Sequence, residues 1–337
     1  MKKKINVGLI GVGRLGKMYA EFLSYRLPQV NLIAVADLIP ERADACAEKY
    51  DVAKKYYNHH DLNMDKEIDA VIVTATTRNH KEIVIDAAQA GKPIFCEKPM
   101  TLNLQEAREM KKVISQKGVF YQQGYMRRFD KGFAAAKKKI EGGEIGDPVV
   151  FRGSSRDPYL PDIDYLRPEN SGGQILDMAI HDIDMARWYM GDVKNVYSIG
   201  GVLAYPEVES TGDTDNVIMA LTFNKGRLGE IDISRNGVYG YDIRAEVLGT
   251  KGTLKVGYLR ETQLLVLNIE GVTHDVVPYF PERFGQAFIS QLEDYCSNLL
   301  NQREPMITIE DGIAGLQVAV AADVSLKSKK VEEVSKF

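Results

Sequence analysis

The chain has 337 residues, and its 43 lysines and arginines nearly balance its 47 aspartates and glutamates, giving a formal net charge of −4. The basic residues are scattered along the chain, which excludes the basic patch typical of nucleic-acid binding. No apolar run is long enough to span a membrane. The length exceeds what one hydrophobic core usually organises, so we expect a soluble enzyme of two or three domains.

The cysteines and the start of the chain indicate the compartment. Cys46, Cys96 and Cys296 are widely spaced and form no CxxC pair, so the sequence predicts neither a disulfide framework nor a metal site. The opening Met1–Lys4 resembles the basic start of a signal peptide, but the strand that follows is too short for the apolar segment of one. We therefore expect a cytoplasmic protein.

The first motif is a glycine turn directly after a strand. The apolar run Ile5–Ile10 predicts a buried strand, and the sequence GVGRLG joins it to a helix. In a dinucleotide-binding turn the first glycine allows a tight bend, the second admits the pyrophosphate, and the third lets the helix pack on the strand. The alternative is an ordinary turn. The expected cofactor contacts are Gly11, Gly13, Arg14, Leu15 and Gly16.

An acidic residue follows the second apolar run. Leu32–Ala36 predicts a strand, and Asp37 stands at its end, where a carboxylate can bind the ribose diol of an adenosine. The same carboxylate would repel a 2′-phosphate, which favours NAD over NADP, although Arg42 nearby leaves that preference open. The alternative is a solvated loop acid.

Strands and helices alternate through the first part of the chain, and this pattern predicts a parallel sheet in an α/β fold. The pattern closes near Gln123, so we expect a dinucleotide-binding domain over residues 1–123 and a second domain over 124–337, whose C-terminal helix can pack back on the first. The expected segments are helices at 40–50, 81–90 and 104–116 and strands at 70–74, 93–96 and 119–122.

The second domain reads differently. A helix at 132–141 precedes several strands joined by short glycine-containing turns, which favour antiparallel pairing. The expected strands are 149–154, 196–203, 217–223, 227–234 and 243–248.

One helix of the second domain, Gln174 to Tyr189, carries candidate catalytic residues. Asp177 lies one helical turn before His181, and an aspartate so placed can fix the tautomer of a histidine and support its charged form. The alternative is a satisfied histidine among solvated acids. The apolar stripe of this helix is Leu176, Ala179, Ile180, Ile183 and Ala186, and Asp184 and Trp188 continue the polar flank.

A charged triplet, Glu97-Lys98-Pro99, follows the strand 93–96, at the edge of the sheet where ligands of open α/β folds collect. A lysine there can bind an oxyanion or a hydroxyl group. The alternative is a surface ion pair beside a proline turn.

Together these motifs resemble the glucose-fructose oxidoreductase, inositol dehydrogenase and rhizopine-catabolism (Gfo/Idh/MocA) family, in particular its inositol 2-dehydrogenase branch. The resemblance covers nearly the whole chain. It implies an N-terminal Rossmann domain, a C-terminal α/β domain with a mostly antiparallel open sheet, a homotetramer and a cis bond before Pro99. The matching segments are Gly11–Gly16 with Asp37, Glu97–Pro99, Gly124–Phe129 and Ser171–Gly173 through Asp177 to His181.

The chain departs from the family pattern after the strand 70–74. Many relatives have a Thr-Pro pair here, whereas this chain has Thr74-Ala75-Thr76-Thr77 with an added Arg78, which leaves the shape of the loop open. His80 keeps about the family spacing. We interpret Thr74, Thr76 and His80, with Glu97 and Lys98, as cofactor-side residues, the alternative for His80 being a purely structural role.

The resemblance implies NAD-dependent oxidation of a cyclitol, myo-inositol or scyllo-inositol, with His181 as the base, Asp177 supporting it and Lys98 stabilising the alkoxide. Polyol recognition needs several polar groups on one face. The candidates are Arg127, Asp157, Tyr239 and Tyr241, with Lys98, Asp177 and His181.

Each of these candidates also has a structural interpretation. Arg128, beside Arg127, is the more natural ion-pair residue, Asp157 can be a turn former, and the two tyrosines, expected on one strand face, can be core aromatics. His59 and His60 are expected on the surface just before a helix.

Three other functions stay open. The same residues suit an aldose or other sugar dehydrogenase using NAD or NADP. A glycosidase that oxidises its substrate transiently would use held NAD without net redox. A ligand-sensing regulator would keep the fold without the chemistry, and the presence of Lys98, Asp177 and His181 argues against it.

Overall fold

The computed structural model describes residues 4–335, so the opening residues 1–3 lie outside it. The chain forms two compact units. Unit 1 runs to Tyr125 and also contains residues 289–313, whereas unit 2 runs from Met126 to Phe288 and resumes at Ala314. The division falls two residues beyond the expected boundary at 123, and most of the C-terminal helix, from Ala314 on, belongs to unit 2.

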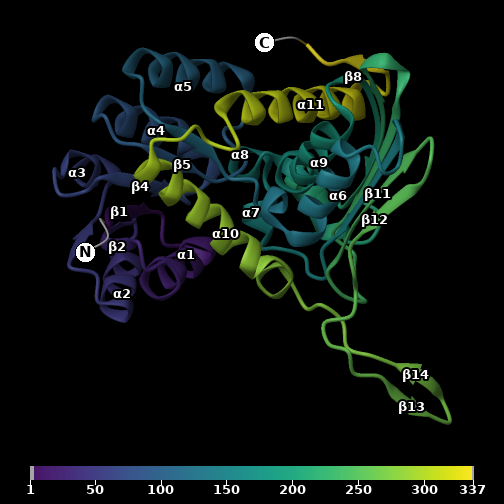
Figure 1. Cartoon of the computed structure of the whole chain (residues 1–337), viewed down its shortest axis with the longest axis horizontal. Coiled ribbons are helices and arrows are strands. Elements are labelled where there is room, and N and C mark those ends of the chain that lie inside the picture. The colour runs from purple at the N-terminus through teal and green to yellow at the C-terminus, as the bar shows by residue number, and fades with distance from the viewer. Residues whose placement is uncertain (1–3, 336–337) are drawn as a thin grey trace. The chain divides into compact units, whose positions relative to one another are not determined.

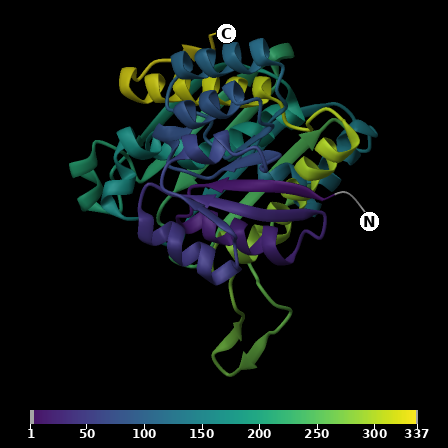
Figure 2. The ribbon, with the colours of Figure 1, turned by 90° about the vertical axis from the view of Figure 1, so that its left-hand side faces the viewer.

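Unit 1 is built on a six-stranded parallel sheet in the order β3-β2-β1-β4-β5-β6. Its central strands are almost entirely apolar because helices cover both faces of such a sheet. Figure 2 shows β1 and β2 in purple, running side by side. The strands are β1 (Ile5–Ile10), β2 (Val30–Ala36), β3 (Lys54–Tyr56), β4 (Ala70–Val73), β5 (Ile94–Cys96) and β6 (Tyr121–Gln123).

The helices of unit 1 alternate with these strands as predicted. The helix expected at 40–50 has those bounds, with Pro40 in its first turn and Asp51 in a left-handed conformation after its last. The short β3 was not expected, whereas a helix was expected directly after His60. The helices are α1 (Arg14–Tyr25), α2 (Pro40–Tyr50), α3 (His59–Met64), α4 (His80–Gln89) and α5 (Leu104–Lys117), with the 3-10 turn η1 (Thr77–Asn79) before α4.

Unit 2 is built on a seven-stranded sheet in the order β12-β11-β7-β10-β9-β8-β15. Only β7 and β10 run parallel, so the expectation of a mostly antiparallel sheet is confirmed. The predicted turns at 224–226 and 249–252 each join an antiparallel pair. The strands are β7 (Pro148–Arg156), β8 (Val193–Gly201), β9 (Asn216–Phe223), β10 (Leu228–Ser234), β11 (Asp242–Gly249), β12 (Thr253–Val256) and β15 (Glu332–Glu333).

Helices cover one face of this sheet, and the other face is exposed to solvent. Helix α9 (Ile180–Met190) packs on β7 and β10, and α6 (Lys131–Glu141) packs on β12, all on one side in Figure 1. Along β9 the residues facing α9 are buried while Ile218, Ala220 and Thr222 point outward. The site residues of unit 2 therefore lie on the helix-covered side.

Beyond residue 252 the sequence predicted only a C-terminal helix, and the structure adds further elements. Two long helices, α10 (Phe280–Asn301) and α11 (Ile309–Ser328), each contribute to both units. A two-stranded hairpin, β13 (Val266–Asn268) with β14 (Gly271–Thr273), stands apart from the seven-stranded sheet in Figure 1. None of the helices within residues 4–335 is long and apolar enough to cross a membrane.

Candidate active site

The glycine turn has the geometry that the motif predicts. Gly11 has a φ of +90°, and a Cβ there would lie 2.6 Å from the backbone of Ala75. A Cβ on Gly16 would collide with the carbonyl oxygen of Gly11, so α1 can follow β1 this closely only with glycine at that position. A Cβ on Gly13 would meet nothing within 4 Å, which leaves the centre of the turn open for a ligand.

Asp37 is tied to that turn at the end of β2. Its Oδ2 accepts a hydrogen bond from the Val12 amide (2.9 Å), and its Oδ1 accepts one from the Ile39 amide (3.0 Å). The carboxylate is thus oriented and not merely solvated, and each oxygen keeps a lone pair for a diol. The open space at Gly13 fits the pyrophosphate of NAD, and the fixed carboxylate of Asp37 fits its ribose.

The loop after β4 supports the glycine turn. Thr74 donates from Oγ1 to the carbonyl of Gly11 (2.6 Å), so its side chain is used inside the protein. Thr76 is exposed and precedes η1, the turn that stands where many relatives have proline. These contacts assign Thr74 to shaping the turn.

His80 is buried and joins two loops. Its Nδ1 lies 2.8 Å from the carbonyl oxygen of Pro99, and its Nε2 lies 2.9 Å from that of Ala75. Burial lowers the pKa of His80, while the two carbonyls oppose that effect. The neutral ring has one N–H and can donate to only one of them. His80 therefore holds the loop after β4 against the loop that carries Lys98.

The Glu97-Lys98-Pro99 triplet follows β5, and the Lys98–Pro99 bond is cis, as the resemblance implies. Glu97 is buried, and its Oε2 accepts the amide of Lys98 (3.0 Å). Its Oε1 accepts from Gln291 of α10 (3.0 Å) and from the hydroxyl of Tyr19. Burial raises the pKa of Glu97. Through these contacts Glu97 holds the backbone of Lys98 in place. Lys98 itself is half-buried.

The predicted helix at 174–189 exists, but it starts with a π-turn, η3 (Ile175–Ala179), before α9. Gly172 and Gly173 precede it with φ of +84° and +79°, and a Cβ on Gly173 would lie 3.0 Å from Asp213 Oδ1. The expected apolar stripe is buried throughout: Leu176, Ala179, Ile180, Ile183 and Ala186.

Asp177 and His181 are each 9% exposed. Tyr165 of α7 (Ile163–Leu166) donates to Asp177 Oδ1 (2.8 Å), and Arg235 donates from Nη2 to Asp177 Oδ2 (3.3 Å). Neither Tyr165 nor Arg235 was among the predicted site residues. No pattern in the sequence marks Arg235, because it only follows a strand and its partners lie far away along the chain.

Both neighbouring arginines make buried ion pairs, as expected for Arg128 and in addition for Arg127. Arg127 and Arg128, in the turn η2 (Met126–Phe129), are both buried ion-pair residues. Arg127 bonds Asp182 (2.8 Å) and Ser155 (3.0 Å), and Arg128 grips both oxygens of Asp184. Each arginine thereby fastens η2 to α9. Asp184 thus has a structural role, which differs from the roles expected of Asp177 and His181.

The two tyrosines do not share a strand face, because β11 begins only at Asp242. Gly240, with a φ of +133°, turns the chain between them. Tyr239 is 40% exposed and donates to Asp242 (2.7 Å), whereas Tyr241 is buried edge-on against Tyr279. Asp157 follows β7, and its carbonyl accepts the amide of Gly237 (2.8 Å).

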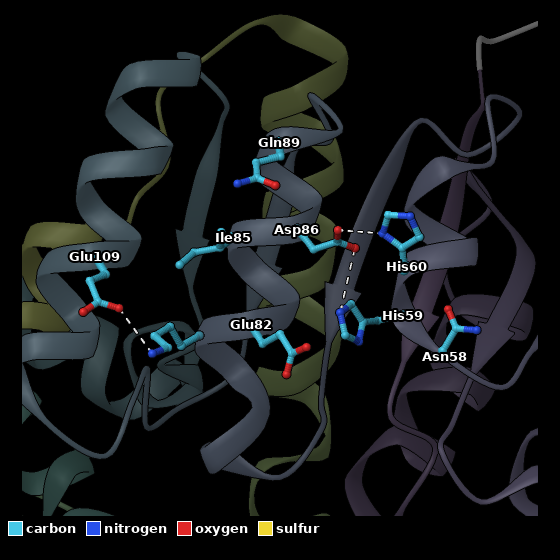
Figure 3. Close-up of a pocket in the computed structure, with 9 residues that line it drawn as sticks. Asn58, His59, His60, Glu82, Ile85, Asp86, Gln89 and Glu109 are labelled. Carbon is cyan, nitrogen blue, oxygen red and sulfur yellow. Dashed lines mark hydrogen bonds and ion pairs between the residues drawn. The ribbon is translucent and has the colours of Figure 1, made fainter.

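A separate polar recess of about 730 Å³ lies among α3, α4 and α5 (Figure 3). His59 and His60 open α3 and do not precede it, and Asp86 accepts from His60 at 2.9 Å. None of the predicted site residues lines this recess, whose walls are Asn58, His59, His60, Lys81, Glu82, Ile85, Asp86, Gln89 and Glu109.

Comparison with known proteins gives matches along the whole chain. A family model described as an oxidoreductase family with an NAD-binding Rossmann fold matches residues 5–125, and the GFO/IDH/MocA C-terminal domain matches residues 133–255. The chain is 40% identical over 335 residues to a myo-inositol 2-dehydrogenase of Thermotoga maritima, covering 98% of this chain and 99% of that protein.

Two further relatives agree in extent. The NAD(+)-dependent scyllo-inositol 2-dehydrogenase of Bacillus subtilis is 35% identical over 97% of this chain and 96% of its own. The crystal structure of a scyllo-inositol dehydrogenase from Lactobacillus casei with bound NAD(H) and scyllo-inositol superposes with a TM-score of 0.94, at 31% identity, over 99% of this chain and all of that one. The chain therefore belongs to the GFO/IDH/MocA family of NAD-binding oxidoreductases.

Proposed function

We propose that this protein oxidises a secondary alcohol of an inositol, myo or scyllo, to the corresponding ketone with NAD. The observation that carries the proposal is the full-length similarity to both a scyllo- and a myo-inositol 2-dehydrogenase. The chemistry of the site supports it, because the chain offers a dinucleotide turn, a lysine at the sheet edge and an aspartate–histidine pair.

NAD would be held by the glycine turn and Asp37. The amide-rich start of α1 suits the pyrophosphate, and the oriented carboxylate of Asp37 suits the adenosine ribose. When bound, NAD accepts the hydride that leaves the carbinol carbon. Thr74 shapes the turn through Gly11, and His80 and Glu97 brace the neighbouring loop.

His181 serves as the base. An alcohol is too weak an acid to ionise freely at neutral pH, and an imidazole with an ordinary pKa of about 6.5 can take the proton as the carbon is oxidised. Asp177 lies one turn earlier and is held by Tyr165 and Arg235, so its carboxylate is oriented before substrate arrives. A fixed carboxylate supports the positive histidine that forms.

Lys98 stabilises the alkoxide that develops at the reacting oxygen, and in the reverse direction it polarises the ketone. Its position depends on groups that touch no substrate. Glu97 accepts its amide, and His80 contacts the carbonyl of the next residue.

Recognition of the other hydroxyl groups falls to Asp157 and Tyr239, which keep partly exposed side chains. Tyr241 and Arg127 are buried and support them. Tyr241 packs against Tyr279 near Asp157, and Arg127 is bonded to Ser155 on β7, two residues before Asp157.

The first experiment follows NADH absorbance with purified protein, NAD and a panel of myo-, scyllo- and chiro-inositol, glucose and xylose, repeated with NADP. We expect turnover with an inositol and NAD. Turnover only with glucose or xylose would replace the proposal by a sugar dehydrogenase. No turnover from folded protein that binds NAD would contradict it and favour a glycosidase or a sensor.

Two substitutions test the assigned roles. Lys98→Ala and His181→Ala should each lower kcat by roughly 10²- to 10⁴-fold, because one removes the alkoxide partner and the other the base. NAD affinity, measured by calorimetry, should persist in His181→Ala, which alters unit 2 alone. Equal loss of NAD binding and turnover in that variant would mean that His181 serves the fold.

We also propose a homotetramer in the cytoplasm. The outer face of the seven-stranded sheet supports assembly, because it exposes Ile199, Ile218, Leu228 and Leu248. The three cysteines are free and buried, which suits a reducing compartment. Light scattering coupled to size exclusion should give four times the chain mass, and the chain mass itself would contradict assembly.

A further inference from the structure

We infer that Arg235 is a positioning residue for catalysis, which keeps Asp177 ionised and oriented beside His181. The inference rests on the proposed dehydrogenase function and adds to it a residue outside the predicted site. Arg235 follows the last residue of β10, and its side chain is completely buried.

The contacts of Arg235 are unusual for a buried arginine. Its Nη2 lies 3.3 Å from Asp177 Oδ2 and 3.9 Å from Asp213 Oδ2. Its Nε and Nη1 have no hydrogen-bond partner among residues 4–335. A buried cation with unused donors costs stability unless its charge is compensated.

Comparison with Arg128 separates a structural pair from this one. Arg128 is also buried, but it donates from Nε and Nη2 to both oxygens of Asp184. That bidentate fork satisfies the guanidinium and fixes η2 on α9. Arg235 makes one longer hydrogen bond to the carboxylate of the proposed catalytic pair, so its contribution is mainly its charge.

Asp213 is the second carboxyl group near that charge, and Arg235 lowers its pKa against the larger opposing effect of burial. The pKa of Asp213 is raised overall, chiefly by burial, with the nearby Asp177 acting in the same direction. Its Oδ1 accepts the amide of Gln174 (2.9 Å), which places it at the start of the same helical segment. Arg235 faces two carboxyl groups, and its shorter contact is with Asp177.

The pH dependence follows from the groups that face Asp177. They include Arg235 after β10, Tyr165 from α7, Asp213 from the loop before β9 and His181 one turn along its own segment. The neutral Tyr165 hydrogen-bonds the carboxylate, Asp213 disfavours it, and Arg235 is the cation. Loss of Arg235 should therefore favour protonation of Asp177. As the pH is lowered, the variant should lose activity at a higher pH than wild type does.

The test compares Arg235→Gln and Arg235→Lys with wild type, using kcat/KM against the best cyclitol from about pH 5 to about pH 9. We expect Arg235→Gln to lose about 10- to 100-fold at neutral pH, with the acid limb of the profile displaced upward by about one pH unit. Arg235→Lys keeps the charge, so its acid limb should stay near that of wild type even if kcat falls.

Arg187→Gln is the matched control. Arg187 lies on α9 and pairs with Asp192 (2.9 Å), so this variant makes the same charge change in the same unit. It should leave the profile in place. Melting temperature and NAD affinity, measured for every variant, show whether each protein is folded.

The outcomes distinguish the possibilities. A folded Arg235→Gln protein with unchanged kcat/KM would overturn the inference, as would a uniform loss without displacement of the acid limb. If Arg235→Gln does not fold, Arg235→Met, which also removes the charge, takes its place, with the same expected displacement of the acid limb and the same overturning outcomes. Failure of wild type to oxidise any cyclitol would instead count against the proposed function.

Discussion

The glycine turn of unit 1 and the Asp177 cluster of unit 2 achieve rigidity by different means. The turn is held by uncharged side chains that bond backbone carbonyls: the Gly11 carbonyl accepts from Thr74, and His80 contacts two carbonyls. The Asp177 cluster is held by buried charges of opposite sign. A backbone-built site depends on conformation and space, whereas a charge-built site depends on every ion keeping its partner.

The largest effect should come from breaking a buried ion pair of unit 2. Arg128→Met leaves Asp184 buried without its guanidinium, and we expect the free energy of unfolding to fall by about 3–5 kcal/mol. Urea denaturation measures it. The double variant Arg128→Met/Asp184→Leu should recover most of the loss. An equally unstable double variant would show that packing, and not charge, matters there.

The glycine turn should respond to volume. Gly16→Ala forces its Cβ against the Gly11 carbonyl and should cost about 1–3 kcal/mol and most NAD affinity. Gly13→Ala meets no protein atom, so it should keep the melting temperature while weakening NAD binding in calorimetry. Equal melting temperatures for the two variants would contradict the close approach of α1 to the turn.

His80 gives a smaller effect that tests the bridge between the two loops. His80→Phe removes the ring nitrogens facing the carbonyls of Ala75 and Pro99 and should cost about 0.5–1.5 kcal/mol of stability. We expect kcat to fall more than NAD affinity, because the Lys98 loop loses a brace. His80→Gln should restore part of kcat; loss of NAD affinity alone would point to a direct cofactor contact.

The smallest effect belongs to the exposed pair of His60 and Asp86 in the recess of unit 1. Asp86 raises the pKa of His60, so the pair contributes stability below the ordinary histidine value of about 6.5 and loses it as pH rises through the folded-state value. His60→Gln should therefore lower the melting temperature in acid and leave it unchanged in alkali. A pH-independent difference would mean that the charge of His60 plays no part.

The sequence predicted the backbone-built site better than the charge-built one. Glycines at fixed spacing after a strand leave a local signature, and Asp177 and His181 share a helix, so both were found. The ion pair of Arg127 could not be predicted, because its partner Asp182 lies 55 positions away. Arg235 was missed for the same reason, being 58 positions from Asp177.

Local patterns also limited the fold. Alternating strands and helices gave the parallel sheet, and short turns gave the antiparallel one. The tyrosines at 239 and 241 have strand spacing, but Gly240 bends the chain between them. The π-turn before α9 has no sequence mark, and α10 and α11 lie beyond the last predicted strand.

Unit 1 is formed by two separate segments of the chain, and this affects the order in which its contacts can form during synthesis. Gln291 contacts Glu97, the hydroxyl of Tyr295 donates to the carbonyl of Val71 on β4 (3.2 Å), and the carbonyl of Ile307 accepts the amide of Gln123. During translation the ribosome delivers these groups only after all of residues 126–288. Residues 4–125 of the nucleotide-binding unit therefore lack these contacts, including the Gln291 hydrogen bond to the buried Glu97, until residues 289–313 have been synthesised.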